Sequence, residues 1–182
     1  MKLKKIMTGL VALSALAFGM QSQAAWQPDA DNPVQLDTAK AIASFKKNDP
    51  SLSRFFENAY GYAVYPSVGK GGVVVGGAYG KGMVFEQNQP IGTSTLSQVT
   101  IGLQLGGQAY SEIIFFKDKV ALDDFKRGNY EMGAQVSAVA ATAGASADTS
   151  YNGGVAVFTL AKGGLMFEAS VGGQKFTFTP YK

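Results

Sequence analysis

The sequence predicts an α+β fold, with a curved, barrel-like antiparallel β-sheet, N-terminal helices packed on it and one short helix between strands. Three observations lead to this expectation. Residues 34–59 carry apolar side chains at helical spacing, the chain from Tyr60 onward alternates in short strand-like runs, and glycine-rich segments separate those runs. With 182 residues, 46% of them hydrophobic, the chain can form one domain with a sizeable core.

The N-terminus is expected to be a secretory signal peptide over residues 1–24. Three early lysines precede an apolar run from Ile6 to Met20, and small residues at Ser22 and Ala24 suit a signal peptidase. The run is shorter than the roughly 20 residues that span a bilayer. We expect cleavage after Ala24, an irregular lead-in over residues 25–35 and a single domain over residues 36–182.

Two helices are expected to open that domain. Over 34–48, Ala39, Ile42 and Phe45 fall on one side of a helix. Asp49 and Pro50 are typical of a helix start, so a second short helix should follow over 50–59.

The rest of the chain is expected to be mainly strands. Glycines predict turns at 69–72 and 80–82. Expected strands cover 62–65, 73–79, 83–86, 95–105, 108–116, 134–147, 154–160, 165–171 and 175–181, with a short surface helix over 117–127.

Glycines at even spacing should leave a strip without side chains on one face of a strand. Gly72, Gly76, Gly80 and Gly82 share this parity. One interpretation is strong sheet curvature covered by the N-terminal helices, and the other is a groove that holds a ligand or lipid.

The composition excludes several classes of function. There is no cysteine and no histidine, so thiolate nucleophiles, lipidated cysteines, disulfides and the commonest general base and metal ligand are absent. We therefore expect no enzyme, no metal and no cofactor. The net charge of +3 depends on the three lysines of the predicted signal peptide, so a nucleic-acid partner is not expected.

The candidate site consists of cationic side chains near aromatic residues. Such side chains suit an anionic lipid surface, where each lysine contributes about 1 kcal/mol. The candidate lipid-binding residues are Lys40, Lys46, Lys47, Arg54, Lys70, Lys81 and Tyr65.

The segments GYAVYPSVGKGG at 61–72 and GGAYGKG at 76–82 resemble the SYLF domain family, also known as the yeast actin-patch-regulator-like domain. The segments GLQLGGQAY at 102–110 and KGGL at 162–165 are similar to later parts of the same family. The resemblance implies a lipid-binding module, whose bacterial members are exported envelope proteins and whose eukaryotic members bind phosphoinositides and, in some cases, actin. It also implies that the helix over 34–48 is the lipid-binding segment.

Together these observations predict a non-enzymatic protein of the bacterial periplasm that is not a lipoprotein and is peripheral to a membrane. Its expected partner is an anionic phospholipid surface, with other envelope proteins as further candidates. The alternatives that stay open are a small outer-membrane β-barrel and a structural or stress-related envelope protein that binds other proteins.

Overall fold

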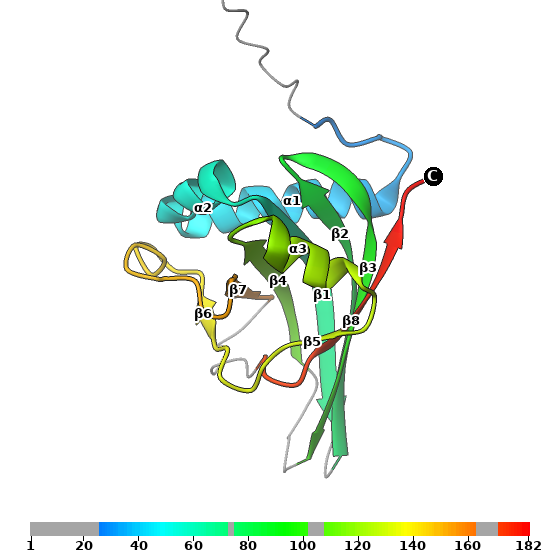
Figure 1. The fold of residues 1–182 in the computed structure, drawn as a ribbon. Coiled ribbons are helices and arrows are strands. Elements are labelled where there is room, and N and C mark those ends of the chain that lie inside the picture. Colours follow the sequence, from blue (N-terminus) through cyan, green and yellow to red (C-terminus); the bar gives the residue numbers. More distant parts are fainter. Residues whose placement is uncertain (1–25, 73–74, 102–107, 163–170) are drawn as a thin grey trace, which may run out of the picture.

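The fold is a mixed α+β half-barrel in a computed structural model that describes residues 26–72, 75–101, 108–162 and 171–182. The predicted signal peptide lies outside these residues, as do residues 73–74, 102–105 and 165–170 of the strands expected at 73–79, 95–105 and 165–171, and Val171 is not in a strand. The described chain begins with helices and continues as a long sheet, with one further helix between its fourth and fifth strands (Figure 1). The fold class predicted from the sequence is confirmed.

Helix α1 (Pro33–Asn48) begins where the side chain of Asn32 accepts hydrogen bonds from the amides of Val34 and Gln35. Asp49 ends α1, and its carboxylate then accepts from Ser51 N at the start of the short helix η1 (Pro50–Leu52), which runs into α2 (Ser53–Asn58). Both expected N-terminal helices are therefore confirmed.

Within the described residues, one sheet of eight strands carries the fold, in the order β5-β8-β3-β2-β1-β4-β7-β6. All neighbouring pairs are antiparallel except β6 with β7. Helix α3 (Lys119–Lys126) follows β4, as expected for residues 117–127. The strands are β1 (Gly61–Gly72), β2 (Val75–Glu86), β3 (Gln89–Ile101), β4 (Gln108–Phe116), β5 (Tyr130–Glu131), β6 (Ala138–Ala140), β7 (Val155–Ala161) and β8 (Lys175–Pro180).

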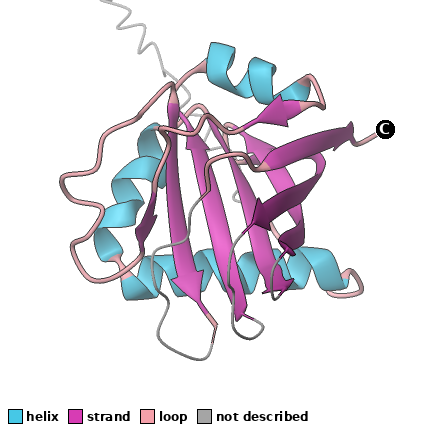
Figure 2. Ribbon diagram, turned by 90° about the horizontal axis from the view of Figure 1, so that it is seen from below, coloured by secondary structure: helices cyan, strands magenta, loops and turns pink. Residues whose placement is uncertain are grey.

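Figure 2 shows the sheet as magenta strands. Each face of this sheet has its own core of buried side chains. On the α1 face, Phe45 of α1 and Phe55 and Phe56 of α2 pack in one cluster with Met83 and Phe115. On the α3 face, the core holds a second set of buried side chains from α3 and the strands. This set includes Leu122, Phe125, Ala63, Val84, Ile114, Phe116 and Phe176.

Three expected elements are wrong. The turns predicted at 69–72 and 80–82 lie inside β1 and β2, and the hairpin turn between β2 and β3 is at Gln87 and Asn88, both with positive φ. The strand predicted over 134–147 is reduced to β6, with turns on both sides, because its many small residues give little side-chain surface for pairing strands to bury.

The glycine strip is filled by the sheet's own side chains. A Cβ on Gly82 would lie 2.7 Å from Cδ1 of Tyr65, and a Cβ on Gly80 would lie 2.9 Å from Cγ2 of Val68. The Tyr65 hydroxyl reaches Ser94 of β3 at 2.7 Å, so its ring crosses β2 at Gly82. Tyr65 and Val68 belong to the core of the α3 face, whereas the N-terminal helices pack on the opposite face. The expectation that these helices cover the glycine strip is therefore wrong at Gly80 and Gly82.

Candidate functional site

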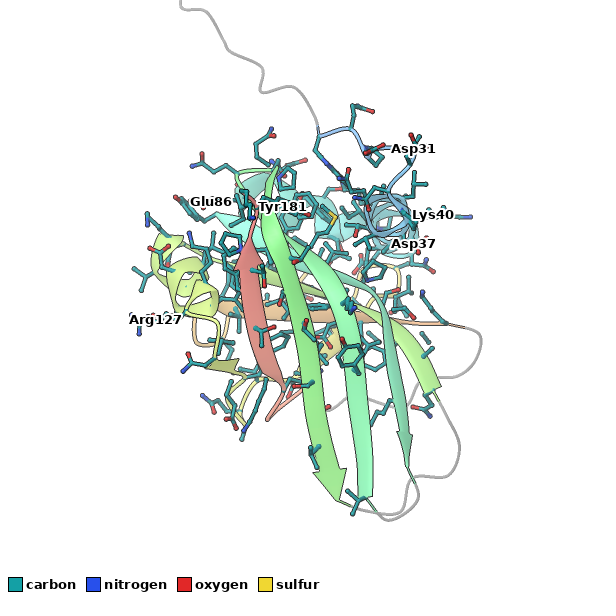
Figure 3. The ribbon with its side chains drawn as sticks, turned by 90° about the vertical axis from the view of Figure 1, so that its right-hand side faces the viewer. Asp31, Asp37, Lys40, Glu86, Arg127 and Tyr181 are labelled. Atoms are coloured by element: carbon teal, nitrogen blue, oxygen red, sulfur yellow. The ribbon has the colours of Figure 1, made fainter. Side chains whose placement is uncertain are left out.

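Lys40 and Lys47 lie on the outward side of α1. Residues seven apart occupy the same side of a helix, and both of these lysines are exposed. Lys40 lies 3.5 Å from the carboxylate of Asp37 and projects away from the sheet (Figure 3). Because both partners are exposed, this ion pair is weak and leaves Lys40 available to another anion.

Lys46 occupies a different flank of the same helix. Its Nζ lies 4.4 Å from the centre of the Phe56 ring, in a cation–π contact that draws the amine toward α2. The side chain also lines a pocket between α1, α2 and the β2–β3 turn. The structure therefore separates Lys46 from Lys40 and Lys47.

Lys70 and Lys81 lie in strands, and their side chains point to opposite faces of the sheet. Lys81 is two residues from Met83 in β2, so both side chains point to the same face, and Met83 packs in the core of the α1 face. Lys70 lies directly across from Ala78, which packs in the core of the α3 face. Neither lysine therefore lies in the glycine turn predicted for it at 69–72 or 80–82. Lys81 shares a face with α1, and Lys70 does not.

Two predicted site residues hold the fold together instead. Tyr65 is completely buried, so it cannot meet a lipid head group. The guanidinium of Arg54 donates to the carbonyl oxygens of Ser146 and Thr149, at 2.5 and 2.7 Å. These bonds tie α2 to the loop before β7, so the geometry assigns Arg54 a structural role.

Exposed apolar side chains extend beyond α1 on the same face as Lys81. Val75, Tyr79 and Val99 expose 64%, 53% and 78% of their surface. Val99 pairs with Gly77, so it lies diagonally across from Val75 and Tyr79, and no side chain stands between them. We call Val75, Tyr79, Lys81 and Val99 the strand patch.

None of the four residues of the strand patch is acidic, and Glu131, which lines a small hollow with Val99, is paired with Lys175 at 3.7 Å. The sole acidic residue in the sequences of β1, β2 and β3 is Glu86, at the far end of β2. Its carboxylate accepts from the Tyr60 hydroxyl at 2.8 Å and from Lys126 at 3.3 Å. The sequence analysis did not predict the strand patch. The pattern that could have predicted it is valine and tyrosine at alternate positions of one strand, at Val75 and Tyr79, with a glycine between them.

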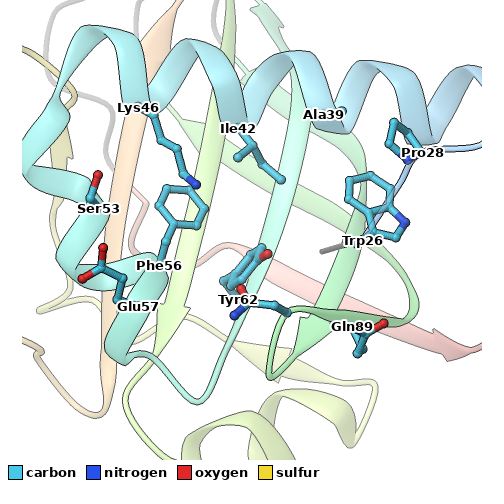
Figure 4. A pocket seen from close by; sticks show the side chains of 11 residues that line it. Trp26, Pro28, Ala39, Ile42, Lys46, Ser53, Phe56, Glu57, Tyr62 and Gln89 are labelled. Atoms are coloured by element: carbon cyan, nitrogen blue, oxygen red, sulfur yellow. The ribbon is translucent and has the colours of Figure 1, made fainter. Parts of the chain in front are cut away.

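The pocket at the other flank of α1 has a volume of about 510 Å³ (Figure 4). Trp26, Ile42 and Phe56 line its apolar part, and Lys46 and Glu57 stand at one end. Tyr62 forms part of the wall and is only 6% exposed. Burial raises the pKa of Tyr62 to about 12, so its hydroxyl stays protonated at neutral pH.

A buried polar pair lies on the α3 face of the sheet. The carboxylate of Glu112 in β4 accepts from Nε2 of Gln174 at 3.0 Å. Burial raises the pKa of Glu112 to about 7, against the opposing effect of this hydrogen bond. Within the described part of the chain, Oε1 of Glu112 and Oε1 of Gln174 have no hydrogen-bond partner.

Among the described residues, no group of three or more acidic side chains is placed to hold a metal ion. In the same part of the chain, no helix has both the length and the apolar character to cross a membrane.

Comparison with known proteins connects this geometry to a family. The family model described as "Ysc84: Las17-binding protein actin regulator" matches residues 97–180, from within β3 to the end of β8. Beta cell expansion factor A of Aeromonas veronii is 30% identical over 139 residues, which make up 75% of this chain and 52% of that protein. The chain thus spans about half the length of this curated relative.

Proposed function

Because the chain belongs to the Ysc84 (SYLF) domain family, we propose that it is a non-enzymatic protein that binds anionic phospholipid bilayers from the aqueous side. The binding surface is the α1 face, with the strand patch and the outward lysines of α1. The observation that carries this proposal is the strand patch, where exposed apolar side chains surround a lysine in strands almost free of acidic residues.

The chemistry of this face suits a bilayer surface. Tyrosine is favoured at the boundary between lipid head groups and hydrocarbon, and Val75 and Val99 can enter that boundary. Lys40, Lys47 and Lys81 add about 1 kcal/mol each near an anionic surface. Their sum of about 3 kcal/mol corresponds to roughly a hundredfold preference for anionic over neutral lipid.

The same face of a second molecule of this protein would be a poorer partner for the strand patch than a bilayer. In a two-fold symmetric contact the patch would meet itself, and Lys81 would approach another lysine without a carboxylate from β1, β2 or β3 to offset the charge. Anionic phosphate groups provide the missing negative charge.

We place the protein in the periplasm after removal of residues 1–24. This location rests on the sequence pattern of a signal peptide, and phosphatidylglycerol and cardiolipin are the expected anionic lipids there.

Vesicle co-sedimentation tests the proposed function. At low salt, the purified protein should pellet with vesicles that contain phosphatidylglycerol, and much less with pure phosphatidylcholine vesicles. Binding should fall as salt is raised from about 50 to 500 mM, because the lysine contribution is screened. Equal pelleting with both vesicle types at low salt would contradict the proposal, and capture of envelope proteins without lipid would favour the protein-binding alternative.

A further inference from the structure

The pocket beside α1 has the construction of a ligand site of its own. It is a half-open hollow bordered by α1, α2, the lead-in at Trp26, Tyr62 of β1 and the β2–β3 turn. Its volume of about 510 Å³ falls within the usual range for small-molecule sites, and its walls are mainly aromatic and aliphatic. Figure 4 shows Ile42 and Tyr62 between Trp26 at one end and Phe56 at the other.

One positive and one negative side chain lie at the end of the pocket near Phe56. Lys46 comes from α1 and Glu57 from α2, and both line the pocket beside Phe56. Among the described residues, these two side chains form no ion pair with each other. A ligand with one negative and one positive group can therefore interact with each of them, whereas a simple anion would meet the carboxylate of Glu57.

Tyr62 adds a hydroxyl group to the wall of the pocket. The ring stacks on Phe85, with centroids 4.8 Å apart, and it meets Phe56 edge-on. These contacts fix the ring, which is only 6% exposed. The hydroxyl is not one of the fully buried polar atoms that lack a partner in the described part of the chain, so it is not sealed from the pocket and can donate to an acceptor on a ligand there.

We infer that this pocket binds a zwitterionic amphiphile with a single apolar chain, whose phosphate and ammonium groups lie at Lys46 and Glu57. The chain lies along Ile42 and Trp26. The Tyr62 hydroxyl donates to an oxygen of the polar end, and the ammonium group of the ligand is held by Glu57 alone, because Lys46 already lies over the Phe56 ring. The same chemistry occurs in a free monoacyl phospholipid and in a lipid drawn from a bilayer.

This pocket lies on the α1 face, but its residues are different from the lysines and the strand patch assigned to the bilayer. Lys46 lies on one flank of α1, whereas Lys40 and Lys47 lie on its outward side. A titration without vesicles therefore tests the pocket alone, and it can succeed or fail whatever the outcome of vesicle binding.

Trp26 is the only tryptophan in the chain, so its fluorescence reports on the pocket directly. The probe is dodecylphosphocholine, titrated below the concentration at which it forms micelles. We expect a saturable change in emission, and binding about tenfold weaker for the uncharged dodecyl maltoside. A response that rises linearly without saturation would overturn the inference.

Three variants test the assigned contacts. Tyr62→Phe should weaken dodecylphosphocholine binding about fivefold, since one hydrogen bond is lost. Lys46→Gln should weaken both dodecylphosphocholine and dodecanoate, whereas Glu57→Gln should weaken only dodecylphosphocholine and should strengthen dodecanoate. Lys117→Gln, an exposed lysine on the turn before α3, is the control and should bind as the unmodified protein does.

The pattern of charge dependence decides the result. If Glu57→Gln changes the affinities for dodecylphosphocholine and dodecanoate equally, the assignment of the ammonium group is wrong. Adding vesicles of phosphatidylethanolamine as competitor distinguishes the two sources. Displacement of the probe identifies a lipid that enters from the bilayer, and retention of the probe identifies a free monoacyl amphiphile.

Discussion

A Gly82→Ala variant should have a free energy of unfolding about 3 kcal/mol lower than the unmodified protein. The added Cβ would collide with the carbonyl oxygen of Val64 and lie 2.7 Å from the Tyr65 ring. The ring cannot retreat easily, because its hydroxyl is bonded to Ser94 and its other side lies in the core. Thermal unfolding should show a drop in Tm of roughly 10 °C.

Gly69→Ala is the matched control in the neighbouring strand. A Cβ at Gly69 would meet nothing within 4 Å, and its backbone carries no positive φ. This variant should stay within about 1 kcal/mol of the unmodified protein. If both substitutions cost the same, the glycines serve chain flexibility instead of making room for Tyr65.

Glu112 should make the stability of the fold fall as the pH rises. Burial raises its pKa from 4.5 to about 7, so the folded protein holds this proton more tightly than the unfolded chain does. Below pH 4.5 Glu112 is protonated in both the folded and the unfolded state, so its ionisation does not change the free energy of unfolding. Between pH 4.5 and 7 only the unfolded chain releases the proton, so the free energy of unfolding falls, by about 3 kcal/mol in total.

A Glu112→Gln variant isolates this contribution, because glutamine stays neutral at every pH. Its free energy of unfolding, minus that of the unmodified protein, should be near zero at pH 4.5 and should rise to about 3 kcal/mol above pH 7. Urea denaturation at a series of pH values measures the difference. Glu57→Gln, which removes an exposed carboxylate, should give a flat difference. A flat line for Glu112→Gln would mean that the buried carboxyl is ionised in the folded protein without cost.

Much of the fold could be predicted because local patterns agree with the final contacts. The strand at 108–116 and the helices α1 and α3 have apolar residues at the period of their own secondary structure. The segment at 80–82 misled the prediction, since glycine usually signals a turn. Here the glycines make room for Tyr65 and Val68, which only the pairing of β1 with β2 brings against them.

The candidate site was harder to predict, because the face of a strand depends on its register. A one-residue shift sends every later side chain to the opposite face, and β1 has such an irregularity between Val64 and Ser67. The sequence could not reveal that this places Lys70 and Lys81 on opposite sides. The exposure of Val99 was equally hidden, since it depends on Gly77 across the strand pair.

The most direct test of the proposed binding face compares charge reversal at Lys81 with charge reversal at Lys70. The two lysines lie in neighbouring strands but point to opposite faces, so Lys81→Glu and Lys70→Glu make the same change in net charge. We would measure flotation of each variant with phosphatidylglycerol vesicles at low salt, after checking that both unfold at the same temperature. Lys81→Glu should weaken binding roughly thirtyfold, from a change of about 2 kcal/mol, and Lys70→Glu should bind nearly as the unmodified protein does. Equal losses in the two variants, or a greater loss for Lys70→Glu, would show that the α1 face is not the surface that meets the membrane.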